Sequence, residues 1–388
     1  MRTDCRICHS TRLELILKLA PTPIGDQFLL TPKEQPLHPI DLYQCQDCGL
    51  AQLLYEIPPE EIYRDYLYLT GSSVGLQDHF EQYARRVATV CNLMEDDLVV
   101  DIGSNDGTLL KYFKLLGAQV CGIEPCEAIA NEARRTAIPT LQRYFGKDLG
   151  IGKAKLITAN NVVANVNDLD AFMEGVCDLL ADDGTFVFES FYLGDVVRNM
   201  VFDFIYHEHL SAFSIRPVKR LMERYGLRLY RVEHLKTKGG SIRYYCNRYY
   251  AGRSQPEIED DDERLYEAQT YVEFAKRIET QRDKTLAFLG EARRRGAKIA
   301  GFGASISATT LIYHFGLDEY LDFLLDDNPA KIGRLSPGHH LKVYRPEEAP
   351  PFDCVIALAW RFADDFRARY PQYPLIVPLP EAKCIPSS

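Results

Sequence analysis

Apolar and polar positions alternate along this chain with two different periods, and together these periods predict α/β structure. Short apolar runs have the sequences LVVDIG (98–103), QVCGIE (119–124), KLITANN (155–161) and GTFVFES (184–190). The segments between them, such as LLKYFKLLG and AIANEARR, carry apolar residues at helical spacing. Buried strands that alternate with amphipathic helices are typical of a doubly wound parallel sheet.

The pattern then changes to a hairpin, a linker and a second α/β unit. Residues 227–235 and 241–248 alternate like strands joined by KTKGG, which predicts an antiparallel hairpin at the sheet edge. The polar, acidic stretch 252–263 indicates a linker, and a long helical pattern follows from about Arg264 to Arg295. AKIAGFGAS (297–305) begins the second unit, with later strands expected within 320–327, 354–360 and 374–379. We expect three parts, at 1–70, 71–250 and 251–388.

Composition and charge exclude several classes of protein. The 388 residues are 46% hydrophobic and 26% charged, as expected for an ordinary soluble globular chain. A formal net charge of −10 argues against a nucleic-acid partner, and we find no apolar run near the length of a membrane span. The N-terminus lacks an apolar signal core, so we expect a cytoplasmic protein. The sequence leaves monomer and homodimer open.

Four of the eleven cysteines form two CxxC pairs, in CRIC and CQDCG. The two-residue spacing lets both sulfurs of a pair face one ion, and four thiolates can close a tetrahedral zinc site. The scattered remainder fits a reducing compartment better than a disulfide framework. We therefore predict structural zinc without an open catalytic position, against the alternative of unrelated free thiols. The predicted ligands are Cys5, Cys8, Cys45 and Cys48.

The stretch VVDIGSNDGTLL (99–110) is a strand, a glycine loop and a helix start. It lacks the full GxGxxG pattern of dinucleotide binders, and its acidic residues would repel a pyrophosphate. They would attract a cation such as S-adenosylmethionine (SAM). Glu124 stands where an acid commonly accepts ribose hydroxyls, and Asn160 and Asn161 end a later strand. A plain strand-to-helix turn is the alternative. The candidate cofactor residues are Asp101, Gly103, Asn105, Asp106, Gly107, Glu124, Pro125, Asn160 and Asn161.

The stretch FDFIYHEHLSAFS (202–214) sets Tyr206, His207, Glu208 and His209 side by side in an apolar run. Such groups need partners when they are buried. A metal site is disfavoured by the spacing, because the two histidines face different sides of a helix, and on a strand Glu208 points away from them. Acid–base or substrate contact is the favoured interpretation, and a hydrogen-bonded piece of the core is the alternative.

These motifs occur together in an order that resembles sugar C-methyltransferases of deoxysugar pathways. The order is DIGSNDGTLL, GIEP, ANNVVANV, FDFIYHEHLSAFS, KGGSIRYY, GFGAS and DDNPAKIGRLSPGHH, and it covers nearly the whole chain, zinc pairs included. The resemblance implies a zinc-binding subdomain, a central class I (Rossmann-like) SAM domain and a C-terminal Rossmann-like domain. It also implies a dTDP- or GDP-linked keto-6-deoxysugar that is methylated beside its ketone, at C-3.

The resemblance also assigns residue roles. His209 falls on the position of the base, and Glu208 and Tyr206 match neighbours that orient it or contact the sugar. Tyr66 and Tyr68 lie where the family has pocket tyrosines. The GFGAS loop and the segment after the next strand correspond to a nucleotide-sugar site, against the alternative of a domain kept only for packing. The substrate residues so implied are Tyr68, Lys238, Ser305, Ser307, Asn328, Lys331 and His340.

The chain departs from the family pattern at three places. Asn165 stands where a histidine is usual, although its amide can still donate to a carbonyl or enolate oxygen. Lys238 replaces another histidine and is either a charged pocket residue or an exposed lysine. Ser307 and Ala308 replace a Lys-Gly pair. The expected function is SAM-dependent C-methylation. The alternatives are an NAD(P)-dependent oxidoreductase of nucleotide sugars, a non-catalytic sugar-nucleotide-binding protein and, more distantly, an RNA methyltransferase.

Overall fold

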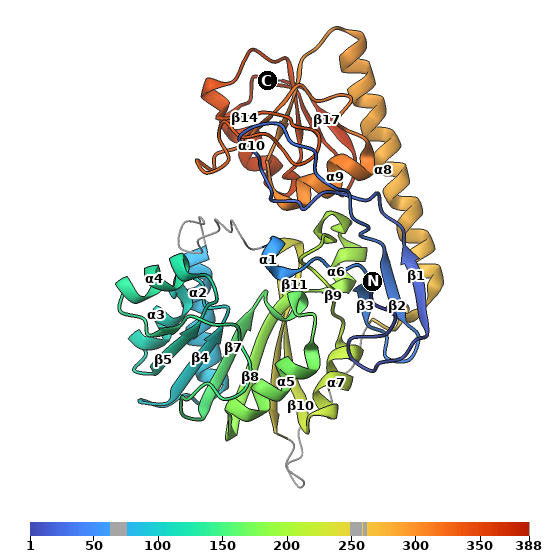
Figure 1. The fold of residues 1–388 in the computed structure, drawn as a ribbon. Helices are drawn as coiled ribbons and strands as arrows, with labels where there is room; N and C mark the ends of the chain where they lie inside the picture. The colour runs from blue at the N-terminus through green and yellow to red at the C-terminus, as the bar shows by residue number, and fades with distance from the viewer. Residues whose placement is uncertain (63–75, 249–257, 259–261, 388) are drawn as a thin grey trace.

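The computed structural model describes residues 1–62, 76–248, 258 and 262–387. They form three units, each with its own sheet (Figure 1). One continuous apolar core includes residues of all three units. Tyr66 and Tyr68 lie outside the described residues.

The first unit is a small antiparallel sheet completed by a strand from elsewhere. It contains β1 (Leu13–Leu17), β2 (Leu42–Cys45), β3 (Ala51–Leu53) and the short helix α1 (Pro59–Ile62). Its fourth strand, β9 (Ser211–Ala212), pairs with β3 and gives the order β1-β2-β3-β9. Because β9 begins two residues after His209, the first unit braces the segment that contains YHEH.

The central unit is a seven-stranded sheet in the order β10-β11-β8-β7-β4-β5-β6. In this sheet β4, β5, β6, β7 and β8 run parallel to one another, and β11 pairs antiparallel with both β8 and β10. The strands are β4 (Leu98–Ile102), β5 (Gln119–Ile123), β6 (Thr140–Leu141), β7 (Ala154–Asn160), β8 (Leu180–Phe191), β10 (Leu227–Leu235) and β11 (Ser241–Arg248). The predicted strands and the edge hairpin are confirmed. The strand order reverses between β4 and β7, the switch point where open α/β sheets bind ligands.

Helices and single 3₁₀ turns connect these strands and cover the sheet. A second apolar cluster lies under α2 and α3, on one face. The helices are α2 (Leu76–Val90), α3 (Thr108–Leu115), α4 (Glu127–Arg135), α5 (Leu169–Leu179), α6 (Leu193–Arg198) and α7 (Ile215–Arg224). The 3₁₀ turns are η2 (Val163–Asn165), η3 (Phe202–Phe204) and η4 (Thr237–Gly239).

The third unit follows the long helix α8 (Ala268–Arg294), which runs past the first unit toward the C-terminal sheet (Figure 1). That sheet has the order β14-β13-β12-β15-β16-β17, and only β17 is antiparallel. Its strands are β12 (Ile299–Phe302), β13 (Phe323–Leu325), β14 (Val343–Tyr344), β15 (Cys354–Ala357), β16 (Leu375–Val377) and β17 (Lys383–Ile385). Its helices and turns are α9 (Ile306–Phe315), η6 (Pro346–Glu348), η7 (Trp360–Phe362) and α10 (Ala363–Arg369), and the turn η5 (Glu263–Tyr266) precedes α8.

The first and third units also touch directly. Leu29 and Leu335 form an isolated backbone bridge between them. Within the described ranges, no helix combines the length and the apolar character needed to cross a bilayer.

Candidate functional site

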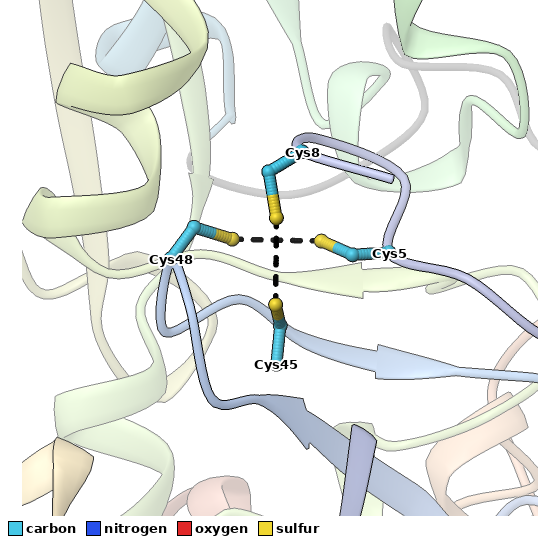
Figure 2. Close-up of side chains that lie close together, drawn as sticks. All are labelled: Cys5, Cys8, Cys45 and Cys48. Atoms are coloured by element: carbon cyan, nitrogen blue, oxygen red, sulfur yellow. Dashed lines mark hydrogen bonds between the residues drawn. The ribbon is translucent and has the colours of Figure 1, made fainter. Parts of the chain in front are cut away.

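The two CxxC pairs of the first unit converge on one point. The Sγ atoms of Cys5 and Cys48 lie 3.5 Å apart, as do those of Cys8 and Cys45, and all four lie within 4.8 Å of one another (Figure 2). Four sulfurs held by one Zn²⁺ at about 2.3 Å in a tetrahedron lie roughly 3.8 Å apart, so the donor set fits this ion. In each pair a backbone N–H returns to the first cysteine, from His9 to Cys5 and from Gly49 to Cys45.

The glycine loop after β4 bends toward the neighbouring strand. Gly103 and Gly107 have positive φ angles of 68° and 78°, where a side chain would be strained. A Cβ on Gly103 would also lie 2.5 Å from a methyl group of Val162. Asp106 accepts hydrogen bonds from the backbone and the hydroxyl of Thr108, the first residue of α3, so its carboxylate is tied into the loop.

Two buried carboxylates line this loop. Asp101 accepts a hydrogen bond of 2.6 Å from the Thr158 hydroxyl, and burial raises the pKa of its carboxyl to about 7. Glu124 accepts from the backbone of Asn105 at 3.2 Å and of Cys126 at 2.9 Å, and burial raises its pKa as well. Buried carboxylates with raised pKa values favour a cationic ligand, because its charge would offset their cost.

The strand beside this loop offers the amide of Asn160. Both polar atoms of its side chain are buried and have no hydrogen-bond partner among the residues that the structure describes. A buried amide without a partner is costly unless a ligand supplies one. Asn161 follows with a φ of 57°, and its N–H donates to the carbonyl of Glu189. Pro125 is exposed and lies two residues beyond the end of β5. These residues fit an organic cation with hydroxyl groups, such as SAM.

The YHEH segment is a turn, neither helix nor strand. The His209 N–H donates to the Tyr206 carbonyl at 2.9 Å, and β9 begins just after it. The imidazole of His209 is buried, stacked on Phe191 at 4.5 Å between ring centroids and packed against Tyr206 at 4.1 Å. Phe191 ends β8, so His209 stands at the same edge of the sheet as the glycine loop. Tyr206 and Glu208 are half-buried.

One hydrogen bond fixes the tautomer of His209. Its Nδ1 lies 2.7 Å from the carbonyl oxygen of Phe204. A carbonyl oxygen can only accept, so Nδ1 carries the hydrogen and the neutral ring has its lone pair on Nε2. An imidazole held in this way can accept a proton at Nε2.

His207 has a different environment. It is 2% exposed, and its Nε2 donates to the carbonyl of His38 in the first unit at 3.2 Å. Burial lowers the pKa of His207 to about 4, so this ring is neutral and structural. Among the described residues, the groups able to hold a metal do not include YHEH; they consist of the four cysteines.

The glycine loop of the third unit leads into α9. Ser305 caps this helix by accepting from the Ala308 N–H at 3.2 Å, and its hydroxyl lies 3.0 Å from that of Ser307. A small cavity of about 10 Å³, roughly the room that one water molecule needs, opens here. Its lining includes Ser305, Tyr313, His339 and, from the first unit, Phe28.

The other predicted substrate residues lie at varying distances from this cavity. Lys331 donates to the Ala304 carbonyl at 2.8 Å and pairs with Asp26 of the first unit at 2.6 Å. Asn328 accepts from the Ala330 N–H, and His340 donates to the Lys33 carbonyl, whereas its neighbour His339 lines the cavity.

Two departures from the family pattern lie near the central sheet. Asn165 ends η2, which packs against β9. Lys238 belongs to η4, the turn between β10 and β11.

The sequence analysis missed a buried ionic group beside the loop. Glu189 pairs with Arg243 at 3.0 Å, accepts from the Thr237 hydroxyl at 3.3 Å, and lies 3.5 Å from His79 Nε2. Burial alone would raise the pKa of Glu189, but His79 and Arg243 hold it below its usual value. The available signal was a carboxylate inside the apolar run FVFESF. Asp203 and Arg361, described below, were missed in the same way.

Comparison with known proteins gives a consistent assignment along the chain. Residues 5–63 match a zinc binding domain, residues 77–232 a methyltransferase domain, and residues 236–380 a C-methyltransferase C-terminal domain. The C-methyltransferase NovU of Streptomyces niveus is 29% identical over 406 aligned positions, which cover 98% of this chain and 96% of NovU.

Solved structures resemble only part of the chain. The magnesium protoporphyrin IX methyltransferase ChlM of Synechocystis PCC 6803 with bound S-adenosylhomocysteine is 17% identical, at a TM-score of 0.37, over 49% of this chain and 92% of that one. The PH0226 protein of Pyrococcus horikoshii OT3 is 13% identical, at a TM-score of 0.39, over 49% and 99%. Both TM-scores are low, so the assignment rests on the domain matches and on NovU.

These matches and the site geometry agree on both cofactors. The four thiolates hold a structural zinc, and the methyltransferase domain of the central unit uses SAM as methyl donor. The three domain matches and the similarity to NovU together support a SAM-dependent C-methyltransferase with an N-terminal zinc-binding domain and a C-terminal C-methyltransferase domain.

Proposed function

We propose that this enzyme methylates the carbon beside the ketone of a nucleoside-diphosphate keto-6-deoxysugar, at C-3, and so makes a branched-chain sugar. The observation that carries the proposal is the His209 imidazole. It is buried among aromatic rings and held by the Phe204 carbonyl with its lone pair on Nε2. A base poised near neutral pH is what removal of a proton next to a ketone requires.

The reaction would run in two balanced steps. His209 Nε2 takes the proton from the carbon, and the electrons of that C–H bond form the enolate. The enolate carbon then bonds to the methyl group, and the S–CH₃ bond breaks with its electron pair left on sulfur. SAM, when bound, supplies that electrophilic methyl group. The apolar walls around His209, including Phe191 and Phe204, would keep water from the enolate.

Neighbouring side chains would support this step. Tyr206 packs on the imidazole and limits its rotation, and Glu208 follows in the same turn. Asn165 lies on η2, against the strand that follows His209, where its amide could donate to the ketone oxygen.

The third unit would hold the nucleotide. Its small cavity has hydroxyl donors at a helix start, which suit a phosphate, and aromatic walls, which suit a base. Lys331 places a cation at the same loop. The eleven free thiols, four of them zinc ligands, support a cytoplasmic location, because thiolate sites need reduced cysteines.

The test is a product assay with a matched pair of histidine variants. Purified enzyme is incubated with SAM and with dTDP-, GDP- and UDP-linked 4-keto-6-deoxysugars, and products are analysed by mass spectrometry. We expect a mass gain of one methyl group with one nucleotide, and in His209→Ala a loss of about 10²- to 10⁴-fold. His234→Ala, which removes an exposed imidazole on β10, should keep full activity. No methylated product with any nucleotide would refute the proposal.

A further inference from the structure

A buried ion pair joins the third unit to the segment that precedes the YHEH turn. Asp203 in η3 is 0% exposed. Its carboxylate accepts hydrogen bonds from Trp360 Nε1 at 3.1 Å and from Arg361 Nη1 at 3.1 and 3.2 Å. Trp360 and Arg361 open η7, just beyond β15 of the third unit. A buried carboxylate with two such partners fixes the backbone that carries it.

The other side of η3 is held from the same unit. The Thr310 hydroxyl of α9 donates to the Ile205 carbonyl at 3.2 Å, and Phe202 stacks on Phe315 of α9 at 5.5 Å between centroids. The guanidinium of Arg361 also lies 4.4 Å above the ring of Phe204. Residues on both sides of Phe204, and its own ring, are thus anchored to the third unit.

The Phe204 carbonyl lies between these anchors and accepts the Nδ1 hydrogen of His209. We propose that Trp360, Arg361 and Thr310 are positioning residues, which hold the His209 imidazole through Asp203, Ile205 and the Phe204 carbonyl. This inference rests on the proposed role of His209 as the base. The third unit would therefore act in proton removal as well as in binding the nucleotide.

Arg361 has a second contact, which links its ion pair with Asp203 to the proposed phosphate site. Its Nη2 lies 3.4 Å from the hydroxyl of Ser307, at the start of α9. One guanidinium therefore touches both the proposed phosphate site and the ion pair that holds the base segment. A phosphate bound at Ser305 and Ser307 would attract the Arg361 guanidinium electrostatically, while Arg361 would keep its hydrogen bonds to Asp203.

The first experiment measures the base without methyl transfer. In D₂O and without SAM, exchange of the proton beside the ketone is followed by NMR for the nucleotide sugar that turns over best. We expect exchange and kcat to fall together about 10- to 100-fold in Arg361→Met and about threefold in Thr310→Val. SAM affinity should stay within twofold, and Arg361→Lys should recover part of the loss.

Matched controls separate positioning from general packing. Arg277→Lys changes another guanidinium that links α8 to the carbonyls of Val197 and Arg198. Thr285→Val removes another buried hydroxyl, which donates to the Gln281 carbonyl within α8. Both controls should keep wild-type exchange. If folded Arg361→Met or Thr310→Val also exchanges like wild type, the inference is overturned.

A second readout needs no substrate. In protein with ¹⁵N-labelled histidine, the wild-type His209 signal, assigned with His209→Gln, should show the tautomer protonated at Nδ1. Arg361→Met should shift His209 toward a tautomer mixture and leave His207 unchanged; an unchanged His209 signal would contradict the inference. Because this measurement is independent of turnover, a wild-type enzyme that exchanges no sugar proton would refute the proposed function alone.

Discussion

The loops after β4 and after β12 share one backbone plan. Each strand enters its loop through a glycine with positive φ, Gly103 at 68° and Gly303 at 101°, and a helix follows. In each, an acid at the end of the next strand accepts a loop N–H, Glu124 from Asn105 at 3.2 Å and Asp326 from Ala304 at 2.6 Å.

The side chains around the two loops differ in charge. Asp101 and Glu124 are buried beside the first loop. Two cations reach the second, Lys331 at the Ala304 carbonyl and Arg361 at the Ser307 hydroxyl. The first loop therefore suits a sulfonium or ammonium group and the second a phosphate. The same strand–loop–helix unit can serve ligands of opposite charge, so the backbone motif alone does not identify the ligand.

Glu124→Ala should show the largest difference between the two loops, because it should weaken SAM binding and leave nucleotide binding unchanged. The substitution removes a charged acceptor from two backbone N–H groups and from the expected ribose hydroxyls. Hydrogen bonds to charged groups contribute about 1.5–3 kcal/mol, so SAM affinity should fall roughly 10- to 150-fold by calorimetry. Nucleotide affinity should not change. Glu132→Ala, which changes a part-exposed acid of α4 that pairs with Arg135, is the control; SAM binding that stays within twofold in Glu124→Ala would remove Glu124 from the site.

The second difference is a pH dependence confined to the first loop. Burial raises the pKa of Asp101 to about 7, and a cation favours its ionised form, so SAM binding should release a proton. From pH 6 to 8 the ionised fraction rises about tenfold, and SAM affinity should rise with it. Asp101→Asn should abolish this rise in calorimetric titrations, whereas a rise that persists in the variant would assign it to another group.

Asp101 should also make the stability of the folded protein depend on pH, and in the absence of SAM this stability should fall as the pH rises. The pKa of Asp101 in the folded protein lies above that of an unfolded aspartate, about 3.9. Its contribution to stability is therefore present below pH 4 and lost as the pH rises through 7. Without SAM, wild type should lose melting temperature across this window relative to Asp101→Asn. Parallel melting curves for the two proteins would argue against the buried acid.

The second loop should respond more weakly to loss of its cation. Lys331→Met removes the ammonium that touches the Ala304 carbonyl, and we expect KM for the nucleotide sugar to rise about three- to fivefold, since a part-exposed charge contributes roughly 1 kcal/mol. SAM affinity should be unchanged. Lys342→Met, which removes an exposed lysine over Tyr344, is the control; equal effects of the two variants would argue against a phosphate at this loop.

Much of the fold followed from periodicity, because apolar runs with helical segments between them have few other solutions. The predicted hairpin strands 227–235 and 241–248 coincide with β10 and β11. The strand β9 could not be predicted, because two residues carry no period and pair with β3 only through the tertiary fold. The YHEH segment was weighed as a helix or a strand and is a turn, closed by the His209 N–H.

The site was predictable where a single residue carries the signal and not where a partner is distant in sequence. The four cysteines could be named from their spacing and type, and the structure brings them together, whereas the acids of the first loop stay predicted SAM ligands. Asp203 stands out as a charge in FDF, but its partners Trp360 and Arg361 lie more than 150 positions away. The hydrogen bond from His209 to Phe204 involves a backbone carbonyl, which no side-chain pattern reveals.

The smallest expected effect concerns dinucleotides, because we expect NADH not to bind at the second loop. The Ala304 N–H is already held by Asp326, and a Cβ on Gly303 would lie 2.4 Å from that of Ala359, so this backbone is covered. The pyrophosphate of a dinucleotide lies directly on the backbone of such a glycine loop, which is covered here, whereas the proposed sugar nucleotide would place its phosphates at the Ser305 and Ser307 hydroxyls. We expect no saturable NADH fluorescence change under conditions in which a nucleoside diphosphate binds. Micromolar NADH binding that Gly303→Ala abolishes would instead favour an oxidoreductase and would remove the assignment of this loop to a nucleotide sugar.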